Sequence, residues 1–244
     1  LGTKVNLFGA IGADSVGAEA VDVLANDPAV TLSLTTDPSR PTTVKTRFIA
    51  GVQQLLRTDD EDSSPLADTL LSGLSKNLEA AMESGDYGAL ILSDYGKGVL
   101  SEAVIAQAIS AAREAGLPVI VDPKGTDYTR YRGASLLTPN RRELAEAARH
   151  PVDSDDEAEA AARILLETCG VEAVIATRGP RGMSVVTADG CVHLPALARE
   201  VFDVSGAGDT VVATVAAGLA AGLALTDAAQ LANVAAGIVV AKVG

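Results

Sequence analysis

Short apolar runs alternate with helical segments along most of this chain, and this order restricts the possible fold more than any other feature. Continuous apolar runs at 89–92, 118–121 and 173–176 are bounded by turn residues and predict buried strands. Apolar residues recur at helical spacing between and after them, as over 101–115 and 155–169. Strands and helices that alternate in this way form a mostly parallel sheet with helices on both faces, so we predict an α/β fold.

The remaining predicted elements continue the same order. Further strands are expected at 5–8, 30–34, 136–137, 184–187 and 191–194, and further helices at 15–26, 66–84, 140–148, 210–225 and 227–243. The alternating, β-branched stretch 42–58 predicts a hairpin turning near Gly51, a small β lid over about residues 40–58. With 244 residues and 48% hydrophobic content, we expect a single domain over residues 1–244.

The charge and composition limit the possible partners. The net charge of −13 argues against a nucleic-acid or anionic membrane surface, and aromatic residues at 3% argue against base stacking. A local cluster of Lys and Arg can still bind a small phosphorylated substrate, because screening weakens distant charges. Neither a signal peptide nor a membrane span is expected, and we predict a cytoplasmic protein.

The sulfur and imidazole side chains are given no chemical role at this stage. Cys169 and Cys191 are too few for a disulfide scaffold, lack metal-binding spacing, and are interpreted as reduced core thiols. His150 and His193 are interpreted as isolated from each other and from cysteine, so no ligand role is predicted for them.

Polar loops follow four of the predicted strands. They cover residues 93–98, 122–125, 138–143 and 177–182. Ligands of open α/β sheets bind at the carboxyl ends of the strands, where these loops meet. Each loop also has a purely structural explanation, since Asp122 suits a turn before proline and Asn140 with Glu143 fits a helix capping box. Their coincidence at one sheet edge favours a site that handles phosphate and metal.

A glycine-rich turn, Asp-Val-Ser-Gly-Ala-Gly-Asp-Thr over residues 203–210, precedes a small-residue helix. Free backbone N–H groups and the positive end of the helix dipole make such a turn an anion site. Asp209 would be repelled by a bound phosphate, and a general base beside a phosphoryl group would explain its presence. The alternative is an ordinary helix start that Asp209 stabilises.

Two common nucleotide motifs are missing from the sequence. There is no G-x-x-x-x-G-K-[ST] segment, and no G-x-G-x-x-G turn follows the first strand. The chain is therefore not a P-loop NTPase, and a dinucleotide-binding protein is disfavoured.

The turn at 203–210 resembles the C-terminal signature of the ribokinase-like (PfkB-type) carbohydrate kinases, and the resemblance spans nearly the whole chain. Asn140 and Glu143 match the N-x-x-E element of that family, and Thr177-Arg178-Gly179 with Gly182 match its nucleotide-phosphate loop. Within the family, the segments 41–47, 53–57, 92–98 and 121–127 are most similar to heptose 7-phosphate kinases.

The resemblance implies a reaction in which ATP phosphorylates the anomeric hydroxyl of D-glycero-D-manno-heptose 7-phosphate. Asp209 would be the catalytic base, and Gly206, Ala207 and Gly208 would form the anion hole. Asn140 and Glu143 would orient Mg²⁺. The implied nucleotide-binding residues are Asn140, Thr177, Arg178, Gly179, Gly182 and Asn233.

A sugar phosphate also needs cationic partners. The residues predicted to bind the sugar phosphate are Lys45, Arg47, Lys97 and Lys124, joined by Asp94 and Asp122. Lys45 and Arg47 have a competing role in an exposed lid hairpin or a homodimer contact, and a homodimer through the lid is expected.

The chain also departs from the family pattern. It starts after the strand, lid strands and glycine-rich segment with which family members begin, so the N-terminal part of the fold is expected to be missing. No nucleotidyltransferase domain is expected within these 244 residues, although some heptose kinases are fused to one. Two alternatives stay open: another ribokinase-family kinase (fructose, ribose, tagatose phosphate or nucleoside), and a non-catalytic sugar- or nucleotide-binding remnant.

Overall fold

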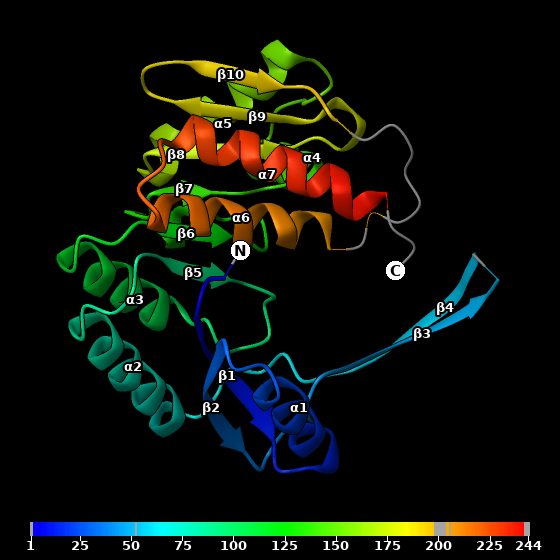
Figure 1. Ribbon diagram of the computed structural model, residues 1–244, viewed down its shortest axis with the longest axis vertical. Coiled ribbons are helices and arrows are strands. Elements are labelled where there is room, and N and C mark those ends of the chain that lie inside the picture. Colours follow the sequence, from blue (N-terminus) through cyan, green and yellow to red (C-terminus); the bar gives the residue numbers. More distant parts are fainter. Residues whose placement is uncertain (1, 52, 198–203, 205, 242–244) are drawn as a thin grey trace. The chain divides into compact units, whose positions relative to one another are not determined.

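A computed structural model describes residues 2–51, 53–197, 204 and 206–241, in two compact units (Figure 1). The first unit contains residues 1–80 and 96–104, and the second contains 81–95 and 105–244. The prediction of a single domain over residues 1–244 stays a prediction. Asp203 and Ser205 of the glycine-rich turn, and the predicted helix end at 242–243, lie outside the described residues.

The second unit is built on a six-stranded mixed sheet in the order β10-β9-β8-β7-β6-β5. Its strands are β5 (Leu90–Ser93), β6 (Val119–Asp122), β7 (Leu136–Leu137), β8 (Ala173–Thr177), β9 (Met183–Thr187) and β10 (Cys191–Leu194). Neighbours from β5 to β8 pair in parallel, whereas β9 pairs antiparallel with β8 and β10. The parallel pairing brings the polar loops after β5, β6, β7 and β8 to one edge of the sheet, as predicted.

Helices cover both faces of this sheet, which confirms the predicted α/β architecture. They are α4 (Arg141–Ala148), α5 (Asp155–Cys169), α6 (Ala207–Ala220) and α7 (Leu225–Val240), while α3 (Glu102–Glu114) crosses the boundary between the units. Ile120 and Ile175 pack in one core cluster with Val215 of α6. Alternation along a strand directs Val121 and Val174, also fully buried, to the opposite face. Each such side chain contributes about 1.5–3 kcal/mol of hydrophobic stabilisation.

The contact between α6 and α7 depends on a small residue. A Cβ atom added at Gly218 would lie 2.9 Å from the Cβ of Ala228. The small-residue composition of these last helices is thus a packing requirement, because a side chain at Gly218 would force the helices apart.

The first unit contains a parallel pair, β1 (Val5–Gly12) and β2 (Val30–Asp37), joined through α1 (Ser15–Ala25). Asp14 caps α1 by accepting from the Gly17 N–H at 2.7 Å, and its other carboxylate oxygen accepts from the Thr42 N–H at 2.7 Å. This capping ties the helix start to the segment that leads into the hairpin.

The predicted hairpin is present as β3 (Val44–Ala50) and β4 (Gln53–Asp60), paired antiparallel. Gly51 at its turn has a φ of 62°, a left-handed conformation that glycine adopts without strain. Helix α2 (Asp68–Glu83) follows and crosses the unit boundary. Among the described residues, none of the helices has the length and apolarity needed to span a bilayer.

Candidate functional site

The glycine-rich turn forms the start of α6, as the sequence predicts. Gly206 is the N-cap residue with a φ of 73°, and it has no side chain to accept the N–H groups of the first turn. The Ala207 N–H donates to the Val204 carbonyl at 3.2 Å. Among the described residues, a Cβ added at Gly208 would meet nothing within 4 Å, so this side of the turn is open with respect to them. Asp209 lies in this same first turn.

Two carboxylates from other elements act on Asp122 beside this turn. Burial raises the pKa of Asp122 to about 6, with further contributions from Glu143 and Asp209. Lys124 opposes this shift. The ends of β6, α4 and α6 therefore bring together acids that are far apart in the sequence, at the sheet edge where a ligand was predicted.

Tyr95 was not singled out from the sequence, yet its hydroxyl lies 3.5 Å from Oδ1 of Asp209. Burial raises the pKa of Tyr95, and the charge of Asp209 adds to this effect. The sequence feature that could have indicated Tyr95 is its position in the polar loop after β5, next to Asp94.

Asn140 and Glu143 form a complete capping box at the start of α4. The Asn140 N–H donates to Oε2 of Glu143 at 3.0 Å, and the Glu143 N–H donates to Oδ1 of Asn140 at 3.0 Å. The interpretation of this pair as a helix capping box is therefore correct. It does not exclude a metal role, because Oε1 of Glu143 points elsewhere and lies 3.9 Å from Nζ of Lys124.

Asp94 is buried and fixed by its neighbours. It accepts a hydrogen bond from the Tyr131 hydroxyl at 2.7 Å and lies 3.8 Å from Arg130. Tyr131 also accepts from the Lys124 N–H at 3.2 Å. Asp94 and Tyr131 thus support the loop that holds Asp122 and Lys124, and a direct sugar contact of Asp94 stays a prediction.

The predicted nucleotide loop follows β8 as a short 3₁₀ turn, Gly179–Arg181. The Arg178 N–H donates to the Gly182 carbonyl at 2.7 Å, while its guanidinium donates to Asp155 at 2.6 Å. Gly182 is structurally required, because its φ is 80° and an added Cβ would lie 1.9 Å from the Leu194 carbonyl oxygen.

The other residues predicted to bind the nucleotide lie at the adjoining ends of β8 and α4 and on α7. Thr177 forms an isolated parallel bridge with Asn140, so the ends of β8 and α4 adjoin. Asn233 is buried on α7 and donates to the Pro195 carbonyl at 2.8 Å. Nucleotide contacts of these residues stay predictions.

The predicted sugar-phosphate cations are divided between the two units. Lys45 lies 2.9 Å from Asp59 and 3.0 Å from Glu61, and Lys97 also pairs with Glu61. Arg47 is exposed on β3. These three residues belong to the first unit, whereas Lys124 lies beside Glu143 in the second.

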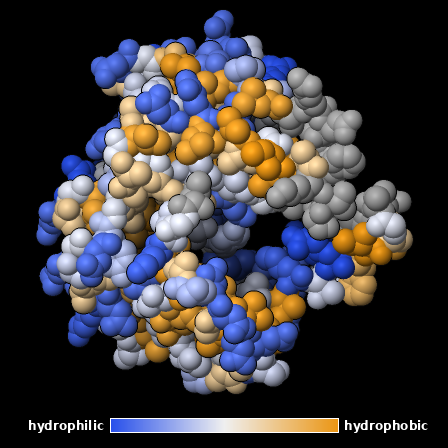
Figure 2. All heavy atoms as spheres, in the orientation of Figure 1, coloured by the Kyte–Doolittle hydropathy of each residue, from blue (hydrophilic) through white to orange (hydrophobic). Residues whose placement is uncertain are grey.

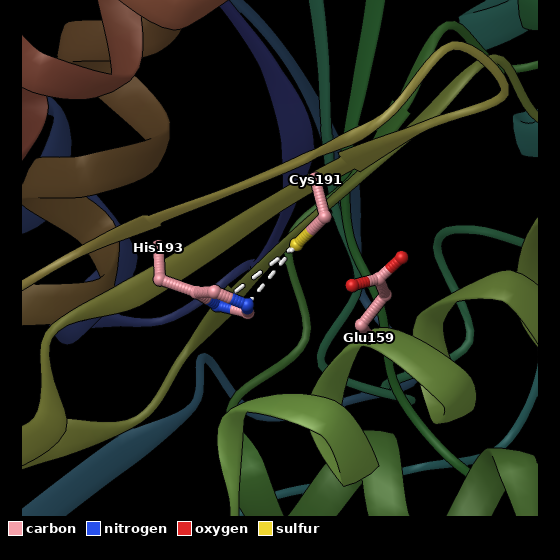
Figure 3. Close-up of side chains that lie close together, drawn as sticks. All are labelled: Glu159, Cys191 and His193. Atoms are coloured by element: carbon pink, nitrogen blue, oxygen red, sulfur yellow. Dashed lines mark hydrogen bonds between the residues drawn. The ribbon is translucent and has the colours of Figure 1, made fainter.

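The interpretation of His193 as isolated from cysteine was wrong. Its Nε2 lies 3.4 Å from Sγ of Cys191, because residues two apart on a strand share a face (Figure 3). His150 instead contacts the Pro151 carbonyl at 2.8 Å.

Magnesium, which the family resemblance implies, fits the residues at the sheet edge. Mg²⁺ prefers oxygen ligands, and a divalent cation would relieve the repulsion that Glu143 and Asp209 exert on Asp122. The raised pKa of Asp122 is the observation that supports this fit.

Comparisons with known proteins agree with this fold. The pfkB family carbohydrate kinase profile matches residues 1–244, and the chain belongs to this family. It is 51% identical over its whole length to the "Bifunctional protein HldE" of Paramagnetospirillum magneticum and covers 50% of that protein. It is 54% identical to the protein of the same name from Rhodospirillum rubrum and covers 49% of it. The chain thus spans about half the length of the curated relatives it matches.

Solved structures show the same fold. Phosphofructokinase-2 from Escherichia coli in complex with potassium matches with a TM-score of 0.82 at 21% identity, over 100% of this chain and 78% of that one. Arabidopsis thaliana ribokinase complexed with ribose and ATP matches with a TM-score of 0.78 at 21% identity, over 99% and 77%. The protein is therefore a ribokinase-like carbohydrate kinase by family and by fold.

Proposed function

We propose that this chain transfers the γ-phosphoryl group of ATP to the anomeric hydroxyl of D-glycero-D-manno-heptose 7-phosphate, giving the 1,7-bisphosphate. The observation that carries the proposal is the position of Asp209 in the first turn of α6, beside open space and a glycine N-cap. A base and an anion-binding helix start are thereby combined in four consecutive residues.

In this mechanism, Asp209 accepts the proton of the attacking hydroxyl as the phosphoryl group is transferred. The N–H groups of Gly206 and Gly208 stabilise the charge on that group. Ala207 joins them when its N–H leaves the Val204 carbonyl, to which it donates in this structure.

Magnesium would be held by Glu143 through the carboxylate oxygen that its capping box leaves available, and by Asn140 through water. When bound, it neutralises phosphate charge. Thr177, Arg178, Gly179, Gly182 and Asn233 are proposed to bind the nucleotide. Lys45, Arg47, Lys97, Lys124, Asp94 and Asp122 are proposed to bind the sugar phosphate.

The heptose assignment rests on the sequence segments at 41–47, 53–57, 92–98 and 121–127. A panel of sugars and sugar phosphates, with ADP release as the readout, tests it on the full-length protein. We expect heptose 7-phosphate to give the highest kcat/KM. A higher value with fructose, ribose or tagatose phosphate would assign the chain to another kinase of the family.

The base is tested by Asp209→Asn, which keeps the size of the side chain. Turnover should fall by about 10²–10⁴-fold, with ATP binding by calorimetry nearly unchanged. Retained turnover would remove Asp209 from the mechanism. Binding of both substrates without turnover in the unaltered protein would favour the non-catalytic alternative.

We also propose a cytoplasmic homodimer formed through the hairpin β3–β4. Phe48, Ile49, Leu55 and Leu56 of the hairpin are each about half exposed or more. A two-stranded hairpin is marginally stable in water, and a second copy would cover these side chains. Sedimentation of Ile49→Lys should show a monomer if the hairpin is the interface, and an unchanged dimer would place the interface elsewhere.

A further inference from the structure

A cysteine, a histidine and a glutamate converge at one edge of the second unit's sheet, and the proposed kinase reaction uses none of them. Cys191 and His193 lie two residues apart on β10, so their side chains leave the same face of the sheet. Glu159 comes from α5, which packs against β8 and β9. Figure 3 shows its carboxylate facing the sulfur of Cys191.

The three groups have the separation of metal ligands. One ligand atom from each residue lies within 4.8 Å of the others. The Cys191 sulfur and Nε2 of His193 are 3.4 Å apart. A tetrahedral ion with metal–sulfur and metal–nitrogen bonds of about 2.3 and 2.0 Å would separate these two atoms by about 3.5 Å. The sulfur and nitrogen thus need almost no movement to share an ion.

The surrounding residues hold the ligands in a suitable orientation. The buried hydroxyl of Ser184, opposite His193 on β9, lies 2.9 Å from Nδ1 of the ring. When Nδ1 carries the proton, Nε2 is left as a lone-pair donor toward the sulfur. Arg163 contacts Oε1 of Glu159, at 2.9 and 2.7 Å, so Oε2 is the oxygen that would bind the ion.

We propose that Glu159, Cys191 and His193 bind a thiophilic divalent cation of the zinc type. Three protein ligands leave a fourth position for water, and all three residues are half-buried, so the ion has access. Sulfur and imidazole ligands select against magnesium, which makes this site distinct from the proposed oxygen-ligand site. On binding, the S–H bond of Cys191 breaks, its proton passes to solvent, and a sulfur–metal bond forms.

The alternative is a thiol–imidazole hydrogen bond with no metal. Burial and the neighbouring Glu159 raise the pKa of Cys191 to about 11, so the thiol is protonated when no ion is bound. The two explanations differ in one observable property, which is whether a metal–thiolate bond forms.

Cobalt(II) is the probe for that bond, added to the purified protein in a reducing buffer without thiols. We expect one equivalent to bind with a sulfur-to-cobalt charge-transfer band in the near ultraviolet, and zinc(II) to displace it. The band should disappear in Cys191→Ser and in His193→Gln. Ser184→Ala should weaken binding about tenfold, because it removes only the residue that orients the ring.

Cys169→Ser is the matched control, since Cys169 is the other free thiol and lies at the end of α5. It should keep the band. The proposal is overturned if no band forms at millimolar cobalt, or if the band survives Cys191→Ser. Should that variant fail to fold, zinc must slow alkylation of Cys191 in the unaltered protein, and equal alkylation with and without zinc rejects the site.

Discussion

The hydroxyl of Tyr95 lies 3.5 Å from Oδ1 of Asp209, although the two residues are 114 positions apart in the sequence. Tyr95 follows β5, and Asp209 lies in the first turn of α6. A phenol at this distance can donate a long hydrogen bond to the proposed base. It would hold the carboxylate in one orientation relative to the attacking hydroxyl.

Tyr95→Phe should therefore lower kcat by about 3–10-fold and leave the KM for ATP unchanged, since a hydrogen bond of this kind is worth about 0.5–1.5 kcal/mol. Steady-state kinetics of the purified variant provide the measurement. A loss confined to KM would show that Tyr95 binds substrate instead of orienting Asp209.

Gly208→Ala tests whether the space beside the first turn of α6 is needed for activity but not for the stability of the fold. The added methyl group meets no packed neighbour within 4 Å among the described residues, and alanine favours the helix by about 0.5–1 kcal/mol. We expect the melting temperature to rise slightly and turnover to fall at least tenfold, because the methyl group occupies the space proposed for the phosphoryl group.

Gly73→Ala is the matched control for that change. Gly73 lies within α2, and an added Cβ there also meets nothing within 4 Å. It should gain similar stability at full activity. Equal activities of the two variants would remove the α6 turn from the phosphoryl site.

Much of this arrangement could be predicted from the sequence. The apolar runs identified the strands, and parallel pairing explains why the loops holding Asp122 and Asn140 meet. Contacts made by tertiary packing could not be predicted, because the position of Glu159 beside Cys191 depends on how α5 packs on β9. The two-residue spacing of Cys191 and His193 on a strand was the one local signal available for that cluster.

The stability of the fold should depend on pH because of Asp122 and the carboxylates near it. The pKa of Asp122 is about 6 in the folded chain, against 3.8 for an ordinary aspartate. Below about pH 3 the group is neutral in both states. As the pH rises from about 3 to 7, the unfolded chain loses the proton first, so this group lowers the stability of the fold, and the cost is complete above about pH 7.

Asp122→Asn should remove this cost. Without Mg²⁺, the variant should be about 1–2 kcal/mol more stable than the unaltered protein at about pH 7.5, the value being reduced by partial exposure, and equally stable at about pH 3. Urea unfolding in EDTA at the two pH values measures this. A destabilised variant at pH 7.5 would show that Asp122 is not held among repelling charges.

Tyr128 and Tyr131 are a matched pair for testing whether the hydrogen bond from Tyr131 to Asp94 stabilises the fold. Both rings are buried and pack edge to face with centroids 5.8 Å apart. The Tyr131 hydroxyl donates to Asp94, so Tyr131→Phe leaves a buried carboxylate with one donor fewer and should cost about 1.5–3 kcal/mol. The Tyr128 hydroxyl has no hydrogen-bond partner among the described residues, so Tyr128→Phe should be neutral or stabilising. Urea unfolding of both variants measures the difference, and equal losses would mean that the bond to Asp94 does not stabilise the fold.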